Sequence, residues 1–401
     1  MFFIGIDLAD KSFDFCIVNL YGDVVSRGRE EMSDEGFSSF IQTLNRKGID
    51  ASSCIISLEN PRSRFAEFLC LRGNQLYAPN PKAIARYRES RFNTNAKSDS
   101  ADAQLIADHI REHYRSLKPI KLPPQQIRHL QMLLEDRDKL VKDKTRLSNR
   151  LTSILKEYFP QAFAAFSDIT SKTALLFLER VDSFQEAKGI SRQQWQEMLN
   201  ESHFYNPKAR ERFFQAMQQK EIFISPAVIS AKAMMKRAIL AQLKVVIHCI
   251  YLYDQKIREL FDQIPHSDIF RSLPGVDYLL GAKLLVLFSK EFRSAKEVQS
   301  YCGTSPYSKL SGQSRGVYFR SGCNKFGRNL FVQIAFCSLT SSAFAKSYYR
   351  KKRLEGKSFH HALRCLANVW AKIAFAIWRD KSRYDESKHL AAIALHSLSA
   401  D

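Results

Sequence analysis

The stretch Arg91-Phe-Asn-Thr-Asn-Ala-Lys-Ser-Asp-Ser-Ala-Asp-Ala-Gln-Leu-Ile-Ala-Asp108 carries two carboxylates, Asp99 and Asp102, at the start of a predicted helix over residues 101–107. Residues three apart share one face of a helix, so these carboxylates lie close together. Like charges in such proximity repel unless a cation lies between them, which indicates a Mg²⁺ site. An ordinary helix N-terminus, where Asp caps the helix and complements its dipole, is the simpler explanation of this stretch alone.

The composition indicates a protein that binds a polyanion. The chain has 401 residues and a net charge of +20, which points to nucleic acid, with a membrane surface as the competing partner. No apolar run approaches the length of a transmembrane helix, and Asp7, Asp10 and Lys11 interrupt the apolar N-terminal segment. We therefore expect a cytoplasmic protein with no membrane partner. The eight cysteines form no Cys-x-x-Cys pair, which is typical of reduced, buried thiols.

The first 120 residues alternate predicted strands with predicted helices, which is typical of an α/β sheet. The predicted strands cover residues 2–7, 13–18, 23–27, 54–58 and 75–77. Asp7 and Glu59 each stand at the end of a strand, where chemistry collects in such sheets. We expect Asp7, Glu59, Asp99 and Asp102 to converge, because four such carboxylates can hold two divalent ions about 4 Å apart for phosphoryl transfer.

This order of strands and acids is the ribonuclease-H-like, resolvase-type pattern, and unrelated surface acids are its alternative. Actin-like kinases and chaperones open in a similar way but need Gly-rich nucleotide loops, and this chain has no such loop. Basic residues precede the paired acids and are suited to holding phosphates, although each alone could lie on a solvated helix face. They are Lys82, Arg86, Arg88, Arg91 and Lys97.

The middle of the chain predicts two long helices, one from Gln125 to about residue 158 and one from Pro226 to about residue 260. The second carries a heptad seam, whose members are Ile239, Leu243, Val246, Ile250, Tyr253, Ile257 and Leu260. Two such helices can pair within one chain as an antiparallel hairpin or join two chains as a dimerising arm, and the pattern leaves both open. Residues 160–225 predict short helices with aromatic side chains and carry no functional interpretation.

The C-terminal third predicts a helix-hairpin-helix around Pro274-Gly275, in which Asp277 stands where a second glycine is usual. A packing role for this turn is therefore as well supported as a phosphate contact. Ser311-Gly312 follows in a predicted loop, and a basic stretch with Arg315, Arg320, Lys325 and Arg328 comes next. A serine here could meet a phosphate, but no histidine of the loop can take its proton, so a metal ion or its hydroxide would have to serve. A loop serine is more often a turn residue.

The chain resembles the insertion-sequence one-ten family of transposases, relatives of the Piv invertases. Several motifs coincide in order: Gly5-Ile-Asp7, Glu59, Asn80-Pro-Lys82 with Lys97-x-Asp99-x-x-Asp102-Ala103, Pro274-Gly275, Phe292-Arg-Ser-Ala295, Gly303-x-x-Pro306 with Ser311-Gly312, Asn324-x-x-x-Arg328 with Ala335, and Tyr349 with Gly356-Lys357 and Ala362. The sequence departs from the family where Cys323 replaces a glycine and Gly327 replaces the usual leucine. Residues 160–225 also look longer than the family's usual middle segment.

The resemblance implies an enzyme, a DNA recombinase with a serine nucleophile and a metal site of the Asp-Glu-Asp-Asp type. Asp7, Glu59, Asp99 and Asp102 would bind Mg²⁺, and Ser311 would attack a DNA phosphate to form a 5′-phosphoserine link that conserves the energy of the broken bond. The implied fold is α/β plus α. A RuvC-like (ribonuclease-H-like) mixed-sheet domain would cover residues 1–120, a helical coiled-coil dimerisation region 121–262, and a mostly helical transposase domain with the serine 263–401.

The resemblance also implies partners. Donor and target DNA would meet the basic residues Lys97, Arg315, Arg320, Lys325 and Arg328, and a structured guide RNA (a bridge RNA) from the element's own end would pair with both DNAs. Family members assemble as dimers and tetramers, with metal and serine domains from different subunits. Two alternatives remain: a RuvC-like Holliday-junction nuclease that uses only the acids, and a non-catalytic nucleic-acid-binding scaffold.

Overall fold

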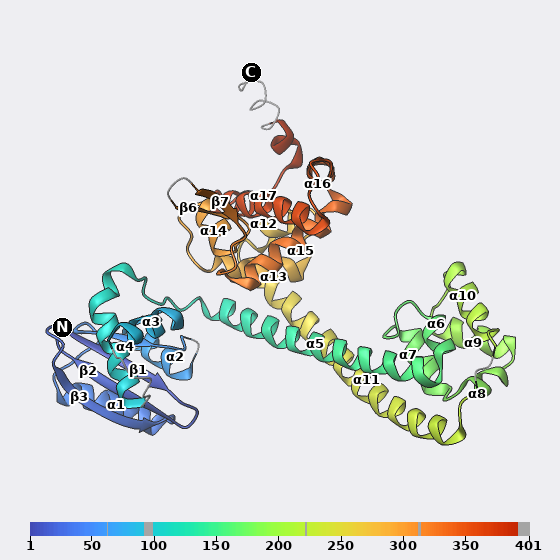
Figure 1. The fold of residues 1–401 in the computed structure, drawn as a ribbon, viewed down its shortest axis with the longest axis horizontal. Helices are drawn as coiled ribbons and strands as arrows, with labels where there is room; N and C mark the ends of the chain where they lie inside the picture. Colours follow the sequence, from blue (N-terminus) through green and yellow to red (C-terminus); the bar gives the residue numbers. More distant parts are fainter. Residues whose placement is uncertain (62, 92–98, 221–222, 312–313, 392–401) are drawn as a thin grey trace. The chain divides into compact units, whose positions relative to one another are not determined.

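The computed structural model describes residues 1–61, 63–91, 99–220, 223–311 and 314–391 (Figure 1). Within these ranges, nothing is described of the side chains of residues 99, 100, 310, 311, 314 and 315. The chain divides into two compact units, Met1–Pro123 and Pro124–Asp401. In the described ranges no helix is long and apolar enough to cross a membrane.

The first unit is built on a five-stranded mixed sheet, which confirms the predicted α/β class. The strands are β1 (Phe2–Leu8), β2 (Ser12–Val18), β3 (Val24–Glu31), β4 (Cys54–Leu58) and β5 (Gln75–Tyr77), in the spatial order β3-β2-β1-β4-β5. β1, β2 and β3 are antiparallel neighbours, whereas β1, β4 and β5 run parallel. Every residue of β4 is buried, as expected of a central strand with both faces covered.

Helices cover both faces of this sheet. α1 (Asp34–Arg46) and α2 (Arg64–Leu71) pack on one face through a cluster of phenylalanines, in which the ring centroids of Phe37 and Phe65 are 4.5 Å apart. α4 (Asp99–His113) packs on the other face, and α3 (Pro81–Arg91) packs against α4. A short 3₁₀ helix (Tyr114–Ser116) follows α4. The alternation of β1 residues between the two faces gives each helix layer its own core.

The second unit begins with a helical arm formed by α5 (Gln125–Tyr158) and α11 (Pro226–Gln263) (Figure 1). The start of α5 packs against the end of α11, as Leu130 lies in one core cluster with Ile257, and the end of α5 packs near the start of α11, as Leu155 lies in another with Ile239. The helices therefore form an antiparallel hairpin within one chain, the first of the two arrangements that the heptad seam allowed.

A small helical domain lies between the two arm helices in sequence. It contains α6 (Pro160–Ala165), α7 (Lys172–Arg180), α8 (Phe184–Lys188), α9 (Arg192–Glu201) and α10 (Pro207–Met217), and confirms the predicted short helices. The helices α7 to α10 begin at a Ser or Asn whose side chain accepts a backbone N–H. Phe177, Trp195 and Phe213 form the centre of its aromatic core.

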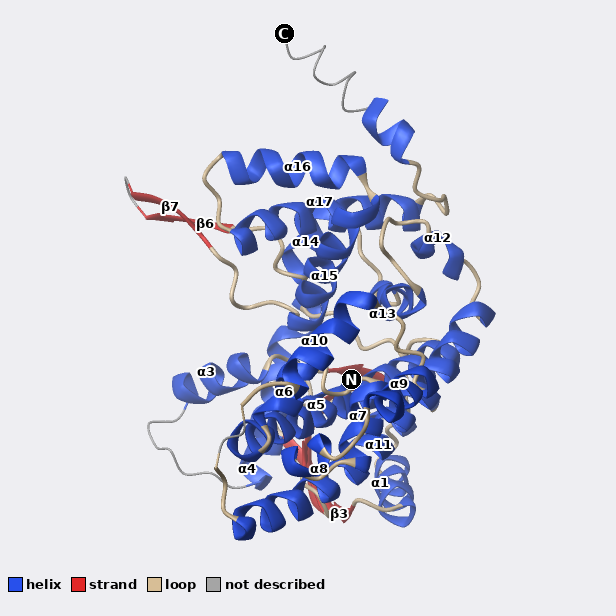
Figure 2. Ribbon diagram, turned by 90° about the vertical axis from the view of Figure 1, so that its right-hand side faces the viewer, coloured by secondary structure: helices blue, strands red, loops and turns tan. Residues whose placement is uncertain are grey.

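The rest of the second unit is a mostly helical domain with a two-stranded hairpin. Its elements are α12 (Ser267–Arg271), α13 (Tyr278–Phe288), α14 (Ala295–Tyr301), β6 (Tyr307–Ser311), β7 (Ser314–Tyr318), α15 (Lys325–Ser341), α16 (Ala343–Leu354) and α17 (Phe359–Arg379). The core centres on Trp370, which is fully buried and donates to the Ser338 hydroxyl. Figure 2 shows the β6–β7 hairpin projecting from these helices.

The turn predicted as a helix-hairpin-helix has a packing role. Gly275 has a positive φ of 74°, and a Cβ atom there would lie 2.6 Å from the carbonyl carbon of Cys337 in α15. The Asp277 side chain caps α13 by accepting from the Leu280 N–H at 2.9 Å. Gly275 and Asp277 are therefore both explained by helix packing and capping.

Candidate active site

Two of the predicted acids stand at adjacent strand ends. β1 and β4 are parallel, with Gly5 opposite Ser57 and Ile6 opposite Leu58. Asp7 is the next residue of β1, and Glu59 follows the last residue of β4. Both residues therefore come at the carboxyl edge of the sheet. Asp7 is partly exposed and Glu59 is exposed, so this edge is open to solvent in the unit.

α4 lies against the sheet face to which Gly5 belongs. A Cβ atom at Gly5 would overlap the carbonyl oxygen of Ala103 and the backbone nitrogen of Ala107, so only glycine permits this approach. The 3₁₀ helix that directly follows α4 lies near the start of β1, because the ring centroids of Phe3 in β1 and Tyr114 in the 3₁₀ helix are 5.4 Å apart. α4 therefore runs antiparallel to β1. Its N-terminus, with Asp99 and Asp102, points toward the edge that carries Asp7 and Glu59.

Asp102 is paired with a cation from the neighbouring helix. Its Oδ1 atom lies 2.5 Å from a guanidinium nitrogen of Arg88 in α3, and both side chains are largely buried. Sequence reasoning did not predict this ion pair, because residues 82–97 were considered only as a basic stretch. The last acid of the opening stretch, Asp108, faces a different environment farther along α4, where burial raises its pKa and the Arg111 guanidinium opposes the shift.

The four predicted metal ligands do not all have described side chains. Asp99 begins α4, but its side chain lies outside the described residues. Among the described side chains, no group of three or more His, Cys, Asp or Glu residues is arranged to hold a metal ion. Among the described residues, Asp7, Glu59 and Asp102 carry carboxylate oxygens, which are the ligands that Mg²⁺ prefers, so these residue types fit Mg²⁺. The fully buried Ser57 hydroxyl, two residues before Glu59, also has no hydrogen-bond partner in the described part of the chain.

The predicted nucleophile lies at the end of a strand and not in an open loop. Ser311 is the last residue of β6, and its backbone pairs with Ser314, the first residue of β7. The Ser311 side chain lies outside the described residues, and so do the Arg315 side chain and all of Lys97. The hairpin thus places the predicted serine at the far end of a short two-stranded element from its helical base.

Two of the predicted basic residues meet at the base of this hairpin. Arg328 of α15 donates to the backbone carbonyl of Arg320, and its guanidinium carbon lies 4.2 Å from the centre of the Phe319 ring. The guanidinium carbon of Arg320 lies 5.9 Å from the centre of the Tyr307 ring. Lys325 is exposed at the first turn of α15. Cationic groups therefore line the hairpin base, as nucleic-acid binding requires.

The motif around Asn324 is explained by local structure. The Asn324 side chain caps α15 by accepting from the Gly327 N–H at 2.8 Å and donates to the Tyr301 hydroxyl at 2.9 Å. A Cβ atom at Gly327 would lie 2.6 Å from the sulfur of Cys302, so a leucine has no room there. The departure from the family pattern thus has a packing reason, and the cap fixes the position of Arg328.

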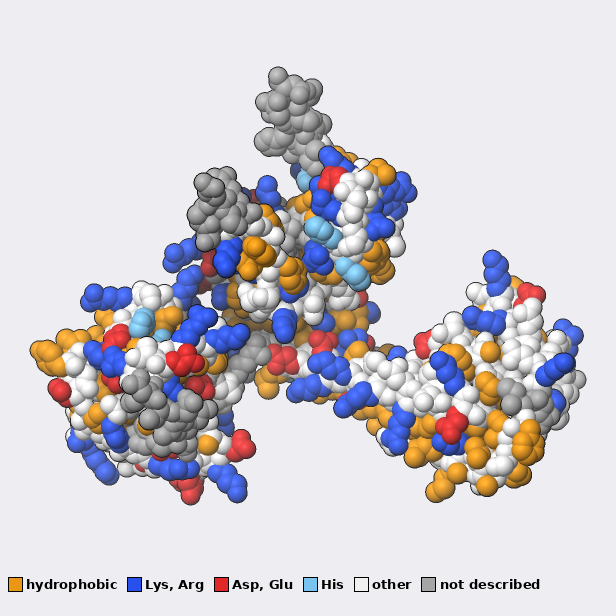
Figure 3. Space-filling view, viewed as in Figure 1, with side chains coloured by type: hydrophobic (Ala, Val, Ile, Leu, Met, Phe, Trp, Pro, Cys, Tyr) orange, Lys and Arg blue, Asp and Glu red, His pale blue; other side chains and the backbone are white. Residues whose placement is uncertain are grey.

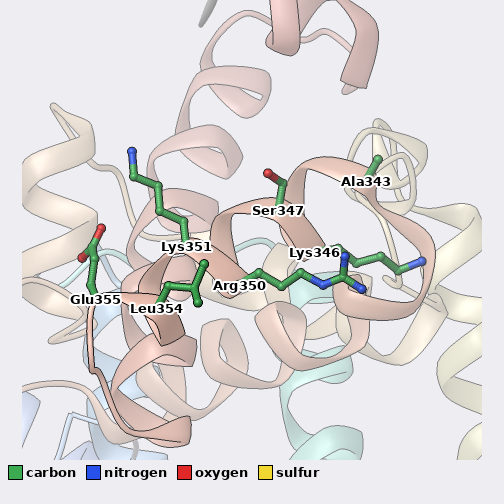
Figure 4. Close-up of a pocket in the computed structure, with 7 residues that line it drawn as sticks. All are labelled: Ala343, Lys346, Ser347, Arg350, Lys351, Leu354 and Glu355. Carbon is green, nitrogen blue, oxygen red and sulfur yellow. The ribbon is translucent and has the colours of Figure 1, made fainter.

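A further basic surface lies on α16, which sequence reasoning did not single out. Lys346, Arg350 and Lys351 are exposed and have no acidic partner among the described residues. Figure 4 shows Lys346 and Arg350 extending along the same side of the helix, and Figure 3 shows blue side chains gathered over this part of the domain. The four-residue spacing of Lys346 and Arg350 would have revealed this surface in the sequence.

Comparisons with known proteins follow the same order along the chain. A family model described as a transposase, of the IS110 type with the Asp-Glu-Asp-Asp label, matches residues 4–160. A second model, described as "Transposase IS116/IS110/IS902 family", matches residues 267–350. The chain belongs to the IS110 family of transposases. The first match contains Asp7, Glu59, Asp99 and Asp102, and the second contains Ser311.

Relatives of the IS110 family align over most of the chain. The "Mini-circle putative transposase for IS117" of Streptomyces coelicolor is 26% identical over 409 residues, covering 98% of this chain and 97% of that protein. The "Insertion element IS110 uncharacterized 43.6 kDa protein" of the same organism is 26% identical over 313 residues and covers 75% of each chain. An insertion-sequence transposase of this family is an enzyme that acts on DNA.

Proposed function

We propose that the protein is an RNA-guided DNA recombinase that moves an insertion sequence through a covalent link to Ser311, with Mg²⁺ held by Asp7, Glu59, Asp99 and Asp102. The observation that carries the metal half is the sheet order β3-β2-β1-β4-β5, with Asp7 and Glu59 at neighbouring parallel strand ends and α4 directed toward them. That arrangement supports assigning the first unit to the ribonuclease-H-like, or RuvC-like, class.

The chemistry of strand exchange balances without ATP. The Ser311 oxygen forms a bond to the phosphorus atom while its proton leaves, and the bond from phosphorus to the 3′ oxygen breaks to release a 3′-hydroxyl. Attack by the 3′-hydroxyl of the exchanged strand then reforms the phosphodiester and frees the serine. A bound Mg²⁺ would supply charge stabilisation at the phosphate. No histidine occurs between residues 267 and 359, so no imidazole of this segment can take the serine proton.

Nucleic-acid binding is the part of the proposal that the second unit supports. Arg320, Lys325 and Arg328 line the base of the serine hairpin, and the exposed face of α16 adds Lys346, Arg350 and Lys351. These groups suit the phosphates of the donor and target DNA and of the guide RNA. The guidance by RNA follows from the family resemblance. Sequencing of RNA that copurifies with the protein tests it, because one enriched structured RNA from the element's end is expected.

An assembly of several copies is also part of the proposal. Val245, Tyr251 and Leu252 on α11 are exposed apolar side chains, with 63%, 56% and 48% of their surfaces accessible. Such side chains on the arm support a dimer that becomes a tetramer when two DNA sites are brought together. Mass photometry with and without nucleic acid measures this directly, and a monomer under both conditions would contradict it.

Substitution of the nucleophile tests the proposed chemistry against the nuclease alternative. Ser311→Ala is expected to abolish strand cleavage and exchange, whereas Ser308→Ala, an exposed serine on the same strand, leaves both unchanged. Asp102→Asn is expected to abolish Mg²⁺-dependent cleavage. Continued cleavage by Ser311→Ala would favour a nuclease that uses only the acids. Unchanged activity of both Ser311→Ala and Asp102→Asn would leave only a nucleic-acid-binding scaffold.

A further inference from the structure

Three aromatic side chains are exposed at the base of the β6–β7 hairpin, outside any core cluster of the described residues. The exposed fractions are 41% for Tyr307, 50% for Tyr318 and 52% for Phe319. Tyr307 and Tyr318 are opposite each other in the strand register, and their ring centroids are 5.8 Å apart with an angle of 31° between the planes. Aromatic surface left in water is unfavourable, so its concentration here calls for a binding partner.

The backbone leaves room for one of these rings. A Cβ atom at Gly316 would overlap the ring of Tyr318, so the ring lies over the strand where glycine stands. This position turns the Tyr318 ring toward its register partner Tyr307 and not away from the hairpin. The two rings therefore offer a prearranged aromatic surface, with few rotamers left to order when a flat ligand binds.

Cationic groups surround the same rings. The guanidinium carbons of Arg328 and Arg364 lie 4.2 Å and 5.2 Å from the centre of the Phe319 ring, and that of Arg320 lies near Tyr307. The Nε atoms of Arg320 and Arg328 are buried without a hydrogen-bond partner in the part of the chain that the structure describes. Both arginine side chains are partly exposed, so the guanidinium N–H groups that reach solvent beside the aromatic rings can bind an anionic acceptor.

We propose that Tyr307, Tyr318 and Phe319 form a stacking platform for an unpaired nucleobase of the DNA, with Arg320 and Arg328 binding the phosphate next to that base. Aromatic faces and guanidinium groups together are how proteins hold single-stranded bases. Four residues of strand separate Tyr307 from Ser311, which is roughly 13 Å. The base therefore lies within a few nucleotides of the phosphate that Ser311 attacks, and the platform holds the strand opened for exchange.

This inference rests on the proposed function, because it takes DNA as the ligand of the hairpin. Binding of DNA to the aromatic platform can nevertheless be measured separately from the attack of Ser311 on the DNA. The experiment uses the full chain carrying Ser311→Ala, without Mg²⁺, and a single-stranded DNA probe with one 2-aminopurine whose fluorescence falls when it stacks on an aromatic ring. Retained quenching alongside a failure of wild-type protein to form a DNA adduct would overturn the proposed chemistry and leave the platform intact.

The decisive variants replace an exposed aromatic side chain with an aliphatic one. Tyr318→Leu and Phe319→Leu are each expected to weaken probe binding about tenfold and to remove the quenching, whereas Tyr318→Phe retains both. Val317→Ala is the matched control, since Val317 directly precedes Tyr318 in β7 and is 73% exposed. Unchanged quenching in both leucine variants would overturn the platform. A change in the oligomeric mass of these variants without a change in quenching would also overturn the platform, because the rings would then contact a second copy of the chain and not a base.

Discussion

At the scale of single residues, the geometry of the candidate active site depends on how closely one backbone segment can approach another. Gly5 lets the first turns of α4 touch β1, and this contact sets how far the helix N-terminus reaches toward the sheet edge. The strand-end positions of Asp7 and Glu59 could be predicted from sequence because apolar runs ending in an acid are local patterns. The pairing of Asp102 with Arg88 could not, because it depends on how α3 packs against α4.

Gly5→Ala is expected to destabilise the first unit by about 3 kcal/mol, because the new methyl group meets backbone atoms that have no room to move. Gly48→Ala serves as the control. Gly48 has a φ of 67° and open space around it, so only the cost of a left-handed alanine, about 1 kcal/mol, is expected. Urea denaturation followed by circular dichroism measures both variants. Equal losses would show that α4 does not pack on β1 as described.

At the scale of elements, periodicity predicted the helices but not their partners. The heptad seam of α11 was correctly predicted to be a packing surface. The spacing of its residues alone does not say whether the helix that faces it belongs to the same chain. The structure shows that α5 of the same chain provides much of the surface that packs against α11. The short helices between α5 and α11 were predicted only as short helices with aromatic side chains, and no local sequence pattern indicated that a buried lysine attaches them to α11.

That lysine provides a test of the helical domain. Lys236 of α11 is fully buried and donates to the Val181 carbonyl at 2.6 Å and to Asp182 at 2.8 Å, closing the end of α7. Lys236→Met is expected to cost about 3 kcal/mol, because buried carbonyls lose their donor. Lys244→Met, which removes a half-exposed lysine paired with Glu179, is expected to cost less than about 1 kcal/mol. Thermal unfolding distinguishes the two, and similar losses would contradict the role of Lys236.

The basic face of α16 makes a prediction about salt. Lys346→Glu combined with Arg350→Glu is expected to weaken DNA binding similarly for all sequences and to reduce the slope of log affinity against log salt by about 2. Lys352→Glu is the control, because Lys352 is already paired with Glu355 at 2.8 Å on the same helix. Fluorescence anisotropy at several salt concentrations measures the slopes. An unchanged slope in the double variant would exclude α16 from the nucleic-acid interface.

At the scale of the whole molecule, the two halves of the proposed chemistry belong to different compact units. The acids lie in Met1–Pro123 and the serine lies in Pro124–Asp401, and each unit contains most or all of one transposase family match. The order of motifs along the sequence was sufficient to predict the family. It could not predict how the two units are arranged on DNA, because the order of motifs carries no information about the relative positions of the units.

The most direct test of this account is the chemical identity of the protein–DNA link. A reaction on donor DNA with the copurified RNA is stopped with denaturant and digested with protease, and the DNA-linked peptides are analysed by mass spectrometry. We predict a peptide containing Ser311 esterified to a 5′-phosphate, which is absent in the Asp7→Asn variant. Cleaved DNA with free 5′-phosphates and no attached peptide, or a link at any other residue, would contradict the account.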